Sequence, residues 1–173
     1  MIVLYKGRRG AGKTLTLVKD AKKYQEQGWK IYRNIEVMSF GEFIKDEEIL
    51  KLDKNHPIQD AVICIDEAQI FFDSRRSMKN QNIKFSNFVQ QIRKRNIIML
   101  VTTQYTNTID LRIRQHVDVI ATPRFNKKYP VCEVTYTDMT SIDDETLIEP
   151  QRTRIVYNPI PIFELFDTRE MIK

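Results

Sequence analysis

The feature that most restricts the fold of this chain is a glycine-rich segment close to its amino terminus. Residues 7–14 read GRRGAGKT and match the pattern G-x4-G-K-[ST]. An apolar run at Ile2–Tyr5 precedes the segment, and an amphipathic helical pattern from Lys13 to about Gln27 follows it. Glycines let successive backbone amides point at one anion, and the start of the helix adds its positive dipole. This order of strand, turn and helix predicts a phosphate-binding loop.

The residue types in this loop suit a nucleotide. The Lys13 ammonium can reach the β- and γ-phosphates, and the Thr14 hydroxyl can bind Mg2+. The alternative is a glycine-rich turn followed by lysine through chance, which average glycine usage makes rare, at roughly 1% of such chains. The predicted nucleotide-binding residues are Gly7, Arg8, Arg9, Gly10, Ala11, Gly12, Lys13, Thr14 and Leu15.

A second motif places two carboxylates directly after a strand. Ala61–Ile65 is a continuous apolar run, typical of a strand covered on both faces, and Asp66 and Glu67 follow it. Ligands of open α/β sheets bind at the carboxyl ends of the strands. Asp66 is suited to hold Mg2+ opposite Thr14, and Glu67 to polarise the water that attacks the γ-phosphate. Acidic residues also favour the first turn of a helix, so the catalytic interpretation depends on the phosphate loop upstream.

Glu67, the glutamate next to Asp66, helps to decide between phosphate transfer and hydrolysis of a nucleotide. Small nucleotide kinases share the loop and the chain length but need no such base, and this chain lacks an obvious lid. A GTPase would carry DxxG and NKxD motifs, whereas residues 126–129 read NKKY. We therefore expect Mg2+-dependent hydrolysis of ATP. A nucleotide-gated DNA-binding module with little turnover is an alternative of another class.

The remaining chain alternates β-rich runs with helical patterns, which is typical of a mostly parallel sheet flanked by helices. Further strands are expected at residues 30–35, 97–103, 117–122, 131–138 and 152–157. Helices are expected from a capping box at Ser39 and Glu42 to about Leu52, and from about Asn82 to Arg95. We expect one α/β domain over residues 1–173, with a core over about 1–125 and a peripheral β-rich tail over about 126–173.

Composition limits the partners and the cellular location that we expect for the protein. The 28 basic and 23 acidic residues give a net charge of +5, which permits an acidic partner without establishing one. Apolar runs reach five residues, against the about 18 needed to cross a bilayer. Cys64 and Cys132 lack a CxxC partner, which argues against a disulfide framework and a zinc ribbon. We expect a cytoplasmic protein that does not insert into a membrane.

Three motifs together resemble one superfamily. The loop GRRGAGKT, the DEAQ run at 66–69 and the TTQ run at 102–104 are similar to those of the FtsK–HerA superfamily of P-loop ATPases. Within it, the likeness is to viral genome-packaging ATPases and to zonula occludens toxin-like ATPases of filamentous phage. An FDT run at 166–168 adds weaker support. The resemblance implies a P-loop NTPase fold of the additional-strand, catalytic-glutamate type, with the TTQ strand between the two motif strands.

The resemblance also implies roles for residues after the TTQ strand. Gln104 would be a polar sensor beside the γ-phosphate, whereas spacing alone places it only at the ligand edge of the sheet. Ring motors of this superfamily complete each ATP site with an arginine from the adjacent subunit. Arg112 and Arg114 follow the sensor strand and are the preferred candidates. The sequence does not choose between them and the other arginines, which are Arg75, Arg76, Arg93 and Arg95.

The partners implied by the resemblance are double-stranded DNA and further copies of the chain, in a homo-oligomeric ring such as a hexamer. Residues 74–109 carry seven basic side chains and no acidic one, so this segment is a candidate for following a phosphate backbone. The toxin-like branch carries a carboxyl-terminal membrane span that this sequence lacks. Packaging of DNA into a viral capsid, with a capsid or portal partner, is therefore the first expectation, and phage extrusion is the alternative.

Overall fold

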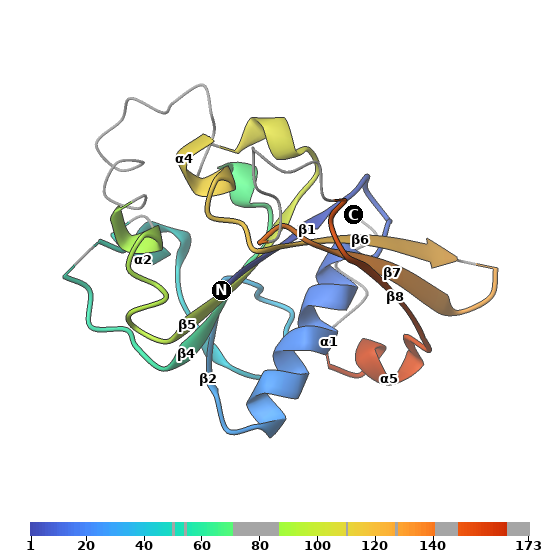
Figure 1. The fold of residues 1–173 in the computed structure, drawn as a ribbon. Coiled ribbons are helices and arrows are strands. Elements are labelled where there is room, and N and C mark those ends of the chain that lie inside the picture. The colour runs from blue at the N-terminus through green and yellow to red at the C-terminus, as the bar shows by residue number, and fades with distance from the viewer. Residues whose placement is uncertain are drawn as a thin grey trace.

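The computed structural model describes residues 1–49, 51–53, 55–70, 87–109, 111–126, 128–140 and 149–165. These residues form one eight-stranded sheet in the order β3-β2-β4-β5-β1-β6-β7-β8 (Figure 1). The strands are β1 (Ile2–Lys6), β2 (Lys30–Arg33), β3 (Glu42–Phe43), β4 (Ala61–Ile65), β5 (Ile97–Thr103), β6 (Val119–Asn126), β7 (Val131–Asp138) and β8 (Arg152–Tyr157). The helices are α1 (Lys13–Glu26), α2 (Asp46–Ile49), α4 (Leu111–Arg114) and α5 (Ile160–Phe163), with 3-10 turns η1 (Ala68–Ile70) and η3 (Thr106–Thr108).

The centre of the sheet is parallel and buried on both faces. Strand β5 lies between β4 and β1 and pairs in parallel with both. The strand that carries the TTQ run therefore separates the two motif strands, as the additional-strand fold type requires. Strand β4 is buried at every position, which agrees with its unbroken apolar sequence. The order of these three strands confirms the predicted fold class.

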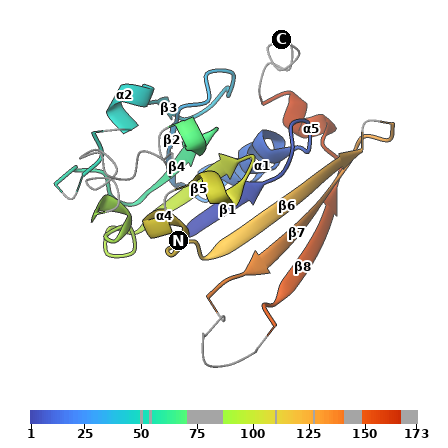
Figure 2. The same ribbon diagram turned by 90° about the horizontal axis from the view of Figure 1, so that it is seen from above.

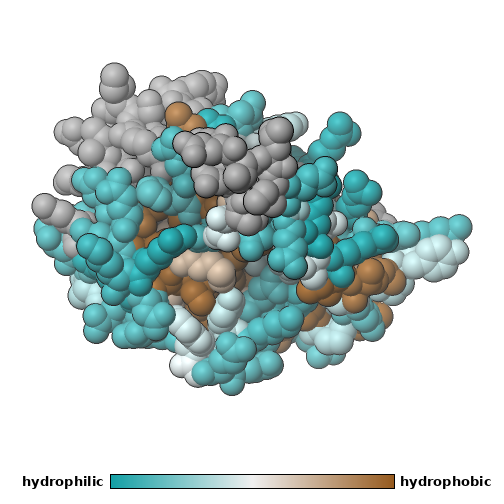
Figure 3. Space-filling model, viewed as in Figure 1, coloured by the Kyte–Doolittle hydropathy of each residue, from teal (hydrophilic) through white to brown (hydrophobic). Residues whose placement is uncertain are grey.

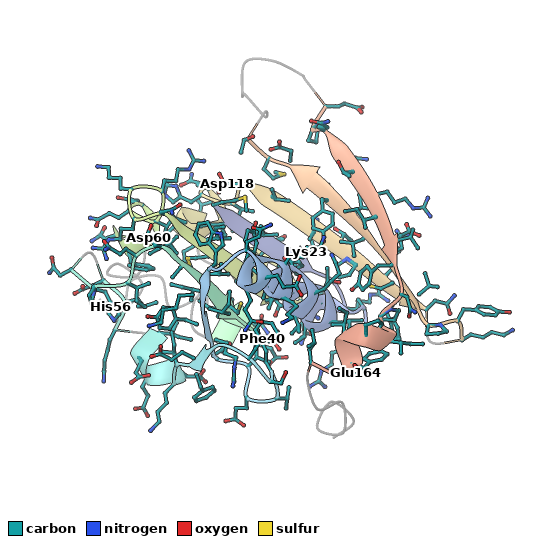
Figure 4. All side chains as sticks on the ribbon, turned by 90° about the horizontal axis from the view of Figure 1, so that it is seen from below. Lys23, Phe40, His56, Asp60, Asp118 and Glu164 are labelled. Carbon is teal, nitrogen blue, oxygen red and sulfur yellow. The ribbon has the colours of Figure 1, made fainter. Side chains whose placement is uncertain are left out.

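Helix α1 covers one face of this sheet and forms a hydrophobic core with it. A second hydrophobic core lies on the opposite face. Leu17, Val18 and Ala21 are fully buried on the inner side of α1, against central-strand residues such as Tyr5 and Leu100. On the opposite face, apolar residues of the segment 88–92 and of the α4 region pack on β1, β4 and β5. Figure 4 shows α1, marked by Lys23, across the strands, with α5 and Glu164 nearby. The two hydrophobic cores fix the parallel strands beside one another, so that their carboxyl ends lie along one edge of the sheet.

The β-rich tail belongs to the same sheet. Strand β7 pairs antiparallel with the whole of β6, and β8 pairs antiparallel with β7. Figure 2 shows these three strands side by side at one edge of the molecule. Cys132 and Val134 of β7 join the core beneath α1. Figure 3 shows apolar surface near β7 and β8 on a mostly hydrophilic face. Ile155 and Val156 of β8 are exposed.

Two helix predictions are wrong in part. Glu42 lies in β3 rather than in a helix, and the short helix α2 begins at Asp46, where the Lys45 amide donates to the Glu48 carboxylate at 3.0 Å. For the helix predicted from about Asn82 to Arg95, the described part shows one helical turn at 87–89 followed by turns to residue 96. Its apolar stripe is nevertheless buried at Phe88, Val89 and Ile92, whereas residues 82–86 lie outside the described chain.

Candidate nucleotide site

The glycine-rich loop connects the end of β1 to the first residue of α1, as its sequence predicts. Gly12 precedes the helix with φ of +90°, in the left-handed region that favours glycine. A Cβ at this position would lie 3.2 Å from the Phe125 Cβ and 3.3 Å from the Cys132 Sγ. Both the backbone angle and the close approach of β6 and β7 therefore require glycine here. The amide groups at the start of α1 are presented at the carboxyl edge of the sheet, where an anion can bind.

Lys13, the first residue of α1, lies over the loop. Its ammonium donates a hydrogen bond of 3.2 Å to the Arg8 carbonyl oxygen. Burial lowers the pKa of Lys13 below its ordinary value, while the nearby carboxylates of Asp66 and Glu67 oppose this shift. The structure thus holds a partly desolvated cation beside the loop. A bound phosphate would supply the negative charge that such a cation favours.

Thr14 and Asp66 are in contact although one follows β1 and the other follows β4. The Thr14 hydroxyl lies 3.2 and 3.1 Å from the two carboxylate oxygens of Asp66. The Thr102 hydroxyl, at the end of β5, donates to the same carboxylate. Hydroxyl and carboxylate oxygens are ligands that Mg2+ prefers, and the ion usually completes its shell with waters and nucleotide phosphates. The donor set therefore fits Mg2+ between Thr14 and Asp66.

Glu67 is held in an uncommon backbone conformation beside this pair. Its φ is +50°, which is rare for a residue other than glycine and is concentrated at functional sites. The Glu67 amide donates a 2.9 Å hydrogen bond to the Thr102 hydroxyl. Thr102 therefore supports both carboxylate residues, through the Asp66 side chain and the Glu67 backbone. The sequence marked Thr102 as part of the TTQ run but did not predict this role.

Asn34 is a second supporting residue that the sequence analysis missed. It follows β2, and its side-chain oxygen accepts a 2.8 Å hydrogen bond from the Asp66 amide. Its side-chain nitrogen lies 3.4 Å from the Asp66 carbonyl oxygen. Asn34 thus continues the pairing between β2 and β4 by one residue through its side chain. The available signal was a polar residue at the end of a strand, but its neighbour in the sheet was unknown.

The remaining predicted site residues lie on the segment after β5. Gln104 follows β5 directly, at the same edge of the sheet as Asp66, and is half-buried. Arg112 and Arg114 both lie in α4. The Arg114 Nε is buried and has no hydrogen-bond partner within the part of the chain that the structure describes. The sensor role of Gln104 and the role of either arginine in a neighbouring subunit stay predictions.

Two of the three described basic residues of the stretch bond to other parts of the fold. Arg93 bonds to the carboxylate of Asp118, a residue labelled in Figure 4. Arg95 donates to the His56 carbonyl oxygen. Lys94 is exposed. Four basic residues of the stretch lie outside the described residues, as does the FDT run at 166–168; they are Arg75, Arg76, Lys79 and Lys84.

Comparison with known proteins agrees with this geometry. The sequence profile of the family described as zonular occludens toxin (Zot) matches residues 1–167. No curated protein matches the chain in sequence. The structure is similar to the amino-terminal domain of zonular occludens toxin from Neisseria meningitidis, with TM-score 0.68 and 17% identity over 96% of this chain and 98% of that one.

Two other solved structures share the fold. One is the genome packaging NTPase B204 of Sulfolobus turreted icosahedral virus 2, with TM-score 0.62 and 14% identity over 91% of this chain and 96% of that one. The other is the flagellar accessory protein FlaH from Methanocaldococcus jannaschii, with TM-score 0.55 and 10% identity over 80% of this chain and 77% of that one. These likenesses place the chain among P-loop NTPase folds. In the described part of the chain, none of the helices has the length and apolar character to cross a membrane.

Proposed function

Because this chain belongs to the zonular occludens toxin (Zot) family, we propose that it is a Mg2+-dependent ATPase that acts in the assembly of a virus. The observation that carries this proposal is the contact of Thr14 with Asp66, with Glu67 as the next residue. This contact joins the residue after the loop lysine to the carboxylate of the second motif. A metal-binding pair beside a candidate base is the arrangement that hydrolysis of a nucleoside triphosphate needs.

Each residue has a stated task in this proposal. The loop amides and Lys13 bind the phosphates, and the Thr14 and Asp66 oxygens hold Mg2+, which neutralises charge on the β- and γ-phosphates when bound. Glu67 takes the proton of the attacking water. Gln104 donates to the γ-phosphate. Thr102 and Asn34 hold the two carboxylate residues in place.

The Glu67→Gln variant tests the proposal most directly. We expect ATP hydrolysis to fall by about 10²- to 10⁴-fold, because the general base is removed, while the affinity for ATP is retained. Lys13→Ala should instead lose ATP binding. Glu26→Gln is the matched control, since Glu26 is exposed and is the last residue of α1, at the end of the helix opposite the loop. Full hydrolysis by Glu67→Gln would remove this residue from the mechanism.

We further propose that hydrolysis moves double-stranded DNA through a homo-oligomeric ring. Support comes from the fold shared with the genome packaging NTPase B204. The test measures ATP hydrolysis with and without double-stranded DNA while the oligomer mass is recorded. Stimulation by DNA together with a closed oligomer is the expected result. A strict monomer without stimulation would contradict a motor, and near-zero turnover with DNA present would favour a nucleotide-gated binding module.

Membership of the Zot family supports a second role in viral assembly, which is the extrusion of phage. In capsid packaging the motor works with a capsid or portal protein, whereas a phage extrusion motor works with a membrane partner. The match to the Zot family over residues 1–167 favours extrusion over packaging. Affinity purification from the native host separates the two proposals. Recovery of a membrane protein would support extrusion, and recovery of a portal protein would support packaging.

A further inference from the structure

The part of the sheet formed by β6, β7 and β8 has two faces of different character. One face packs against α1, where Cys132 and Val134 of β7 are buried and the Tyr157 hydroxyl of β8 lies 3.0 Å from that of Thr16. Successive side chains of a strand point to opposite faces, so the residues between these positions point away from α1. Figure 2 looks onto this second face, and among the described helices none lies in front of the three strands. We call this second face the outer face.

The register of the three strands shows which side chains share the outer face. Residues that pair directly across antiparallel strands point to the same face of the sheet. Arg124 of β6 pairs with Glu133 of β7, which in turn pairs with Val156 of β8. These three rows contain three arginines, three threonines and one glutamate. The two rows that follow the first are Thr122, Thr135 and Arg154, and then Ile120, Thr137 and Arg152.

The outer face carries an excess of positive charge. Arg124 and Arg152 are exposed and make no ion pair within the described residues. Arg154 donates to the Glu133 carboxylate at 2.7 Å, and its side chain is nevertheless 67% exposed. Three guanidinium groups against one carboxylate leave a net charge of +2 over the three rows. An acidic ligand would find these cations accessible from solvent.

Protection of a sheet edge does not explain all of these arginines. Strand β8 is the last strand of the sheet, and charged side chains on an edge strand hinder unwanted pairing with other chains. Arg152 and Arg154 of β8 fit that role. Arg124, in contrast, lies in β6, which pairs with β1 on one side and with β7 on the other. The positive charge on this inner strand has no edge to protect, which favours an acidic ligand as the reason for it.

The side chains of the outer face suit the phosphate backbone of a nucleic acid. Arginine and threonine side chains both donate hydrogen bonds to phosphate oxygens. From the spacing of strands and of residues along them, the three arginines extend over about 10 Å by 14 Å, so they can reach several phosphates rather than one. None of the side chains in the three rows is aromatic, so the face offers no platform on which unpaired bases could stack. These properties favour the backbone of a duplex over a single strand.

We propose that the outer face of β6, β7 and β8 contacts the phosphate backbone of double-stranded DNA, with Arg124, Arg152 and Arg154 as the cations. The inference rests on the proposed function, since double-stranded DNA is the partner proposed there, but it does not require hydrolysis of ATP. It places DNA on the face of the sheet that points away from α1, and not only on the basic stretch at 74–109. Contacts to the backbone carry no sequence information, so this binding is independent of DNA sequence.

Binding of a DNA duplex of mixed sequence is measured by fluorescence anisotropy over a series of salt concentrations, with and without ATP and Mg2+. The test variant combines Arg124→Ala with Arg152→Ala. Both side chains are exposed, and thermal unfolding checks that the fold is retained. Each cation that contacts a phosphate contributes about 0.9 to the slope of log affinity against log salt concentration. We expect the test variant to bind more weakly and to lower this slope by about 1.8.

Lys23→Ala combined with Lys51→Ala is the matched control. Both lysines are exposed. Lys23 lies on α1, and Lys51 lies near β2 and β3, at the other end of the sheet from β8. The control variant loses the same net charge as the test variant. A slope that stays at the wild-type value in the control therefore assigns the effect to the outer face rather than to the total charge of the protein.

Equal slopes in the test variant and the control variant would overturn the proposal. A changed oligomer mass of the test variant with an unchanged slope would also overturn it, and would assign the outer face to a contact between copies of the chain. Wild-type protein that binds no duplex in either condition would reject both the outer face as a DNA site and the movement of DNA. A lower slope of the test variant in a protein that does not hydrolyse ATP would retain the DNA site and reject the motor.

Discussion

The hydroxyl oxygens of Tyr157 and Thr16 lie 3.0 Å apart, which links the last strand of the sheet to the helix behind the phosphate loop. Thr16 donates to the Gly12 carbonyl oxygen at 2.8 Å, so its own hydrogen is engaged and Tyr157 is the donor to Thr16. One turn further along α1, Asp20 accepts hydrogen bonds of 2.8 Å from the hydroxyls of Tyr5 and Tyr136. Strands β7 and β8 are therefore tied to α1 through partly buried polar groups as well as through apolar packing.

Removal of the Tyr157 hydroxyl should loosen this link. We expect Tyr157→Phe to lower the free energy of unfolding by about 1 kcal/mol and to weaken binding of both ATP and tripolyphosphate, because Thr16 no longer has its donor beside Gly12. Chemical denaturation and ligand titration measure the two effects. Tyr24→Phe is the control, since Tyr24 is a half-buried tyrosine of the same helix. Equal effects of the two substitutions would show that the Tyr157 hydroxyl has no special connection to the loop.

Substitution of Gly12 should lower the stability of the protein more than substitution of a glycine with a similar backbone angle. Gly12 and Gly28 have φ of +90° and +88°, but a Cβ on Gly28 meets no atom within 4 Å. Gly28→Ala should cost about 1–2 kcal/mol of stability, from the left-handed conformation alone. Gly12→Ala adds a clash with Phe125 and Cys132, so we expect a larger loss together with loss of nucleotide binding. Denaturation curves in which both variants lose the same stability would argue against tight packing at Gly12.

Thr102 should affect catalysis through its hydroxyl. Thr102→Val keeps the shape but removes the donor to Asp66 and leaves the Glu67 amide without its acceptor. We expect a loss of about 1–3 kcal/mol in stability and a lower kcat, because Glu67 is no longer held in position. Thr102→Ser keeps the hydroxyl and should retain kcat. If the serine variant lost as much kcat as the valine variant, packing of the methyl group rather than the hydrogen bonds would be the cause.

The affinity for ATP should depend on the charge of Lys13. Burial lowers the pKa of Lys13 from 10.5, so in the free protein its ammonium is lost at a lower pH than for an exposed lysine. Because burial disfavours the charged form of Lys13, the Lys13 ammonium lowers the free energy of unfolding at neutral pH. This loss of stability disappears as pH rises towards 10.5. Phosphate binding needs the ammonium, so ATP affinity should fall as pH rises through the lowered pKa. Titrations at several pH values should show this fall in wild type and not in Lys13→Arg, whose guanidinium stays charged.

Local sequence patterns predicted the central elements well. The apolar runs at β1, β4 and β5 and the helix after the loop were located because each depends on near neighbours along the chain. The capping box at Ser39 and Glu42 failed for a tertiary reason. The Ser39 amide donates to the Leu165 carbonyl oxygen at 2.8 Å, and Glu42 pairs with Tyr32 of β2. Contacts with distant segments therefore displaced a short-range preference.

The sequence alone determined that this chain carries a phosphate loop, a carboxylate pair and a strand ending in TTQ, because these motifs are contiguous residues with a chemistry of their own. Only the tertiary structure decided what supports them. Asn34 holds Asp66 because β2 lies beside β4, Thr102 reaches both carboxylate residues because β5 lies between the motif strands, and Phe125 lies against Gly12 because β6 lies beside β1. These partners come from separate strands, and no local pattern states which strands will be neighbours.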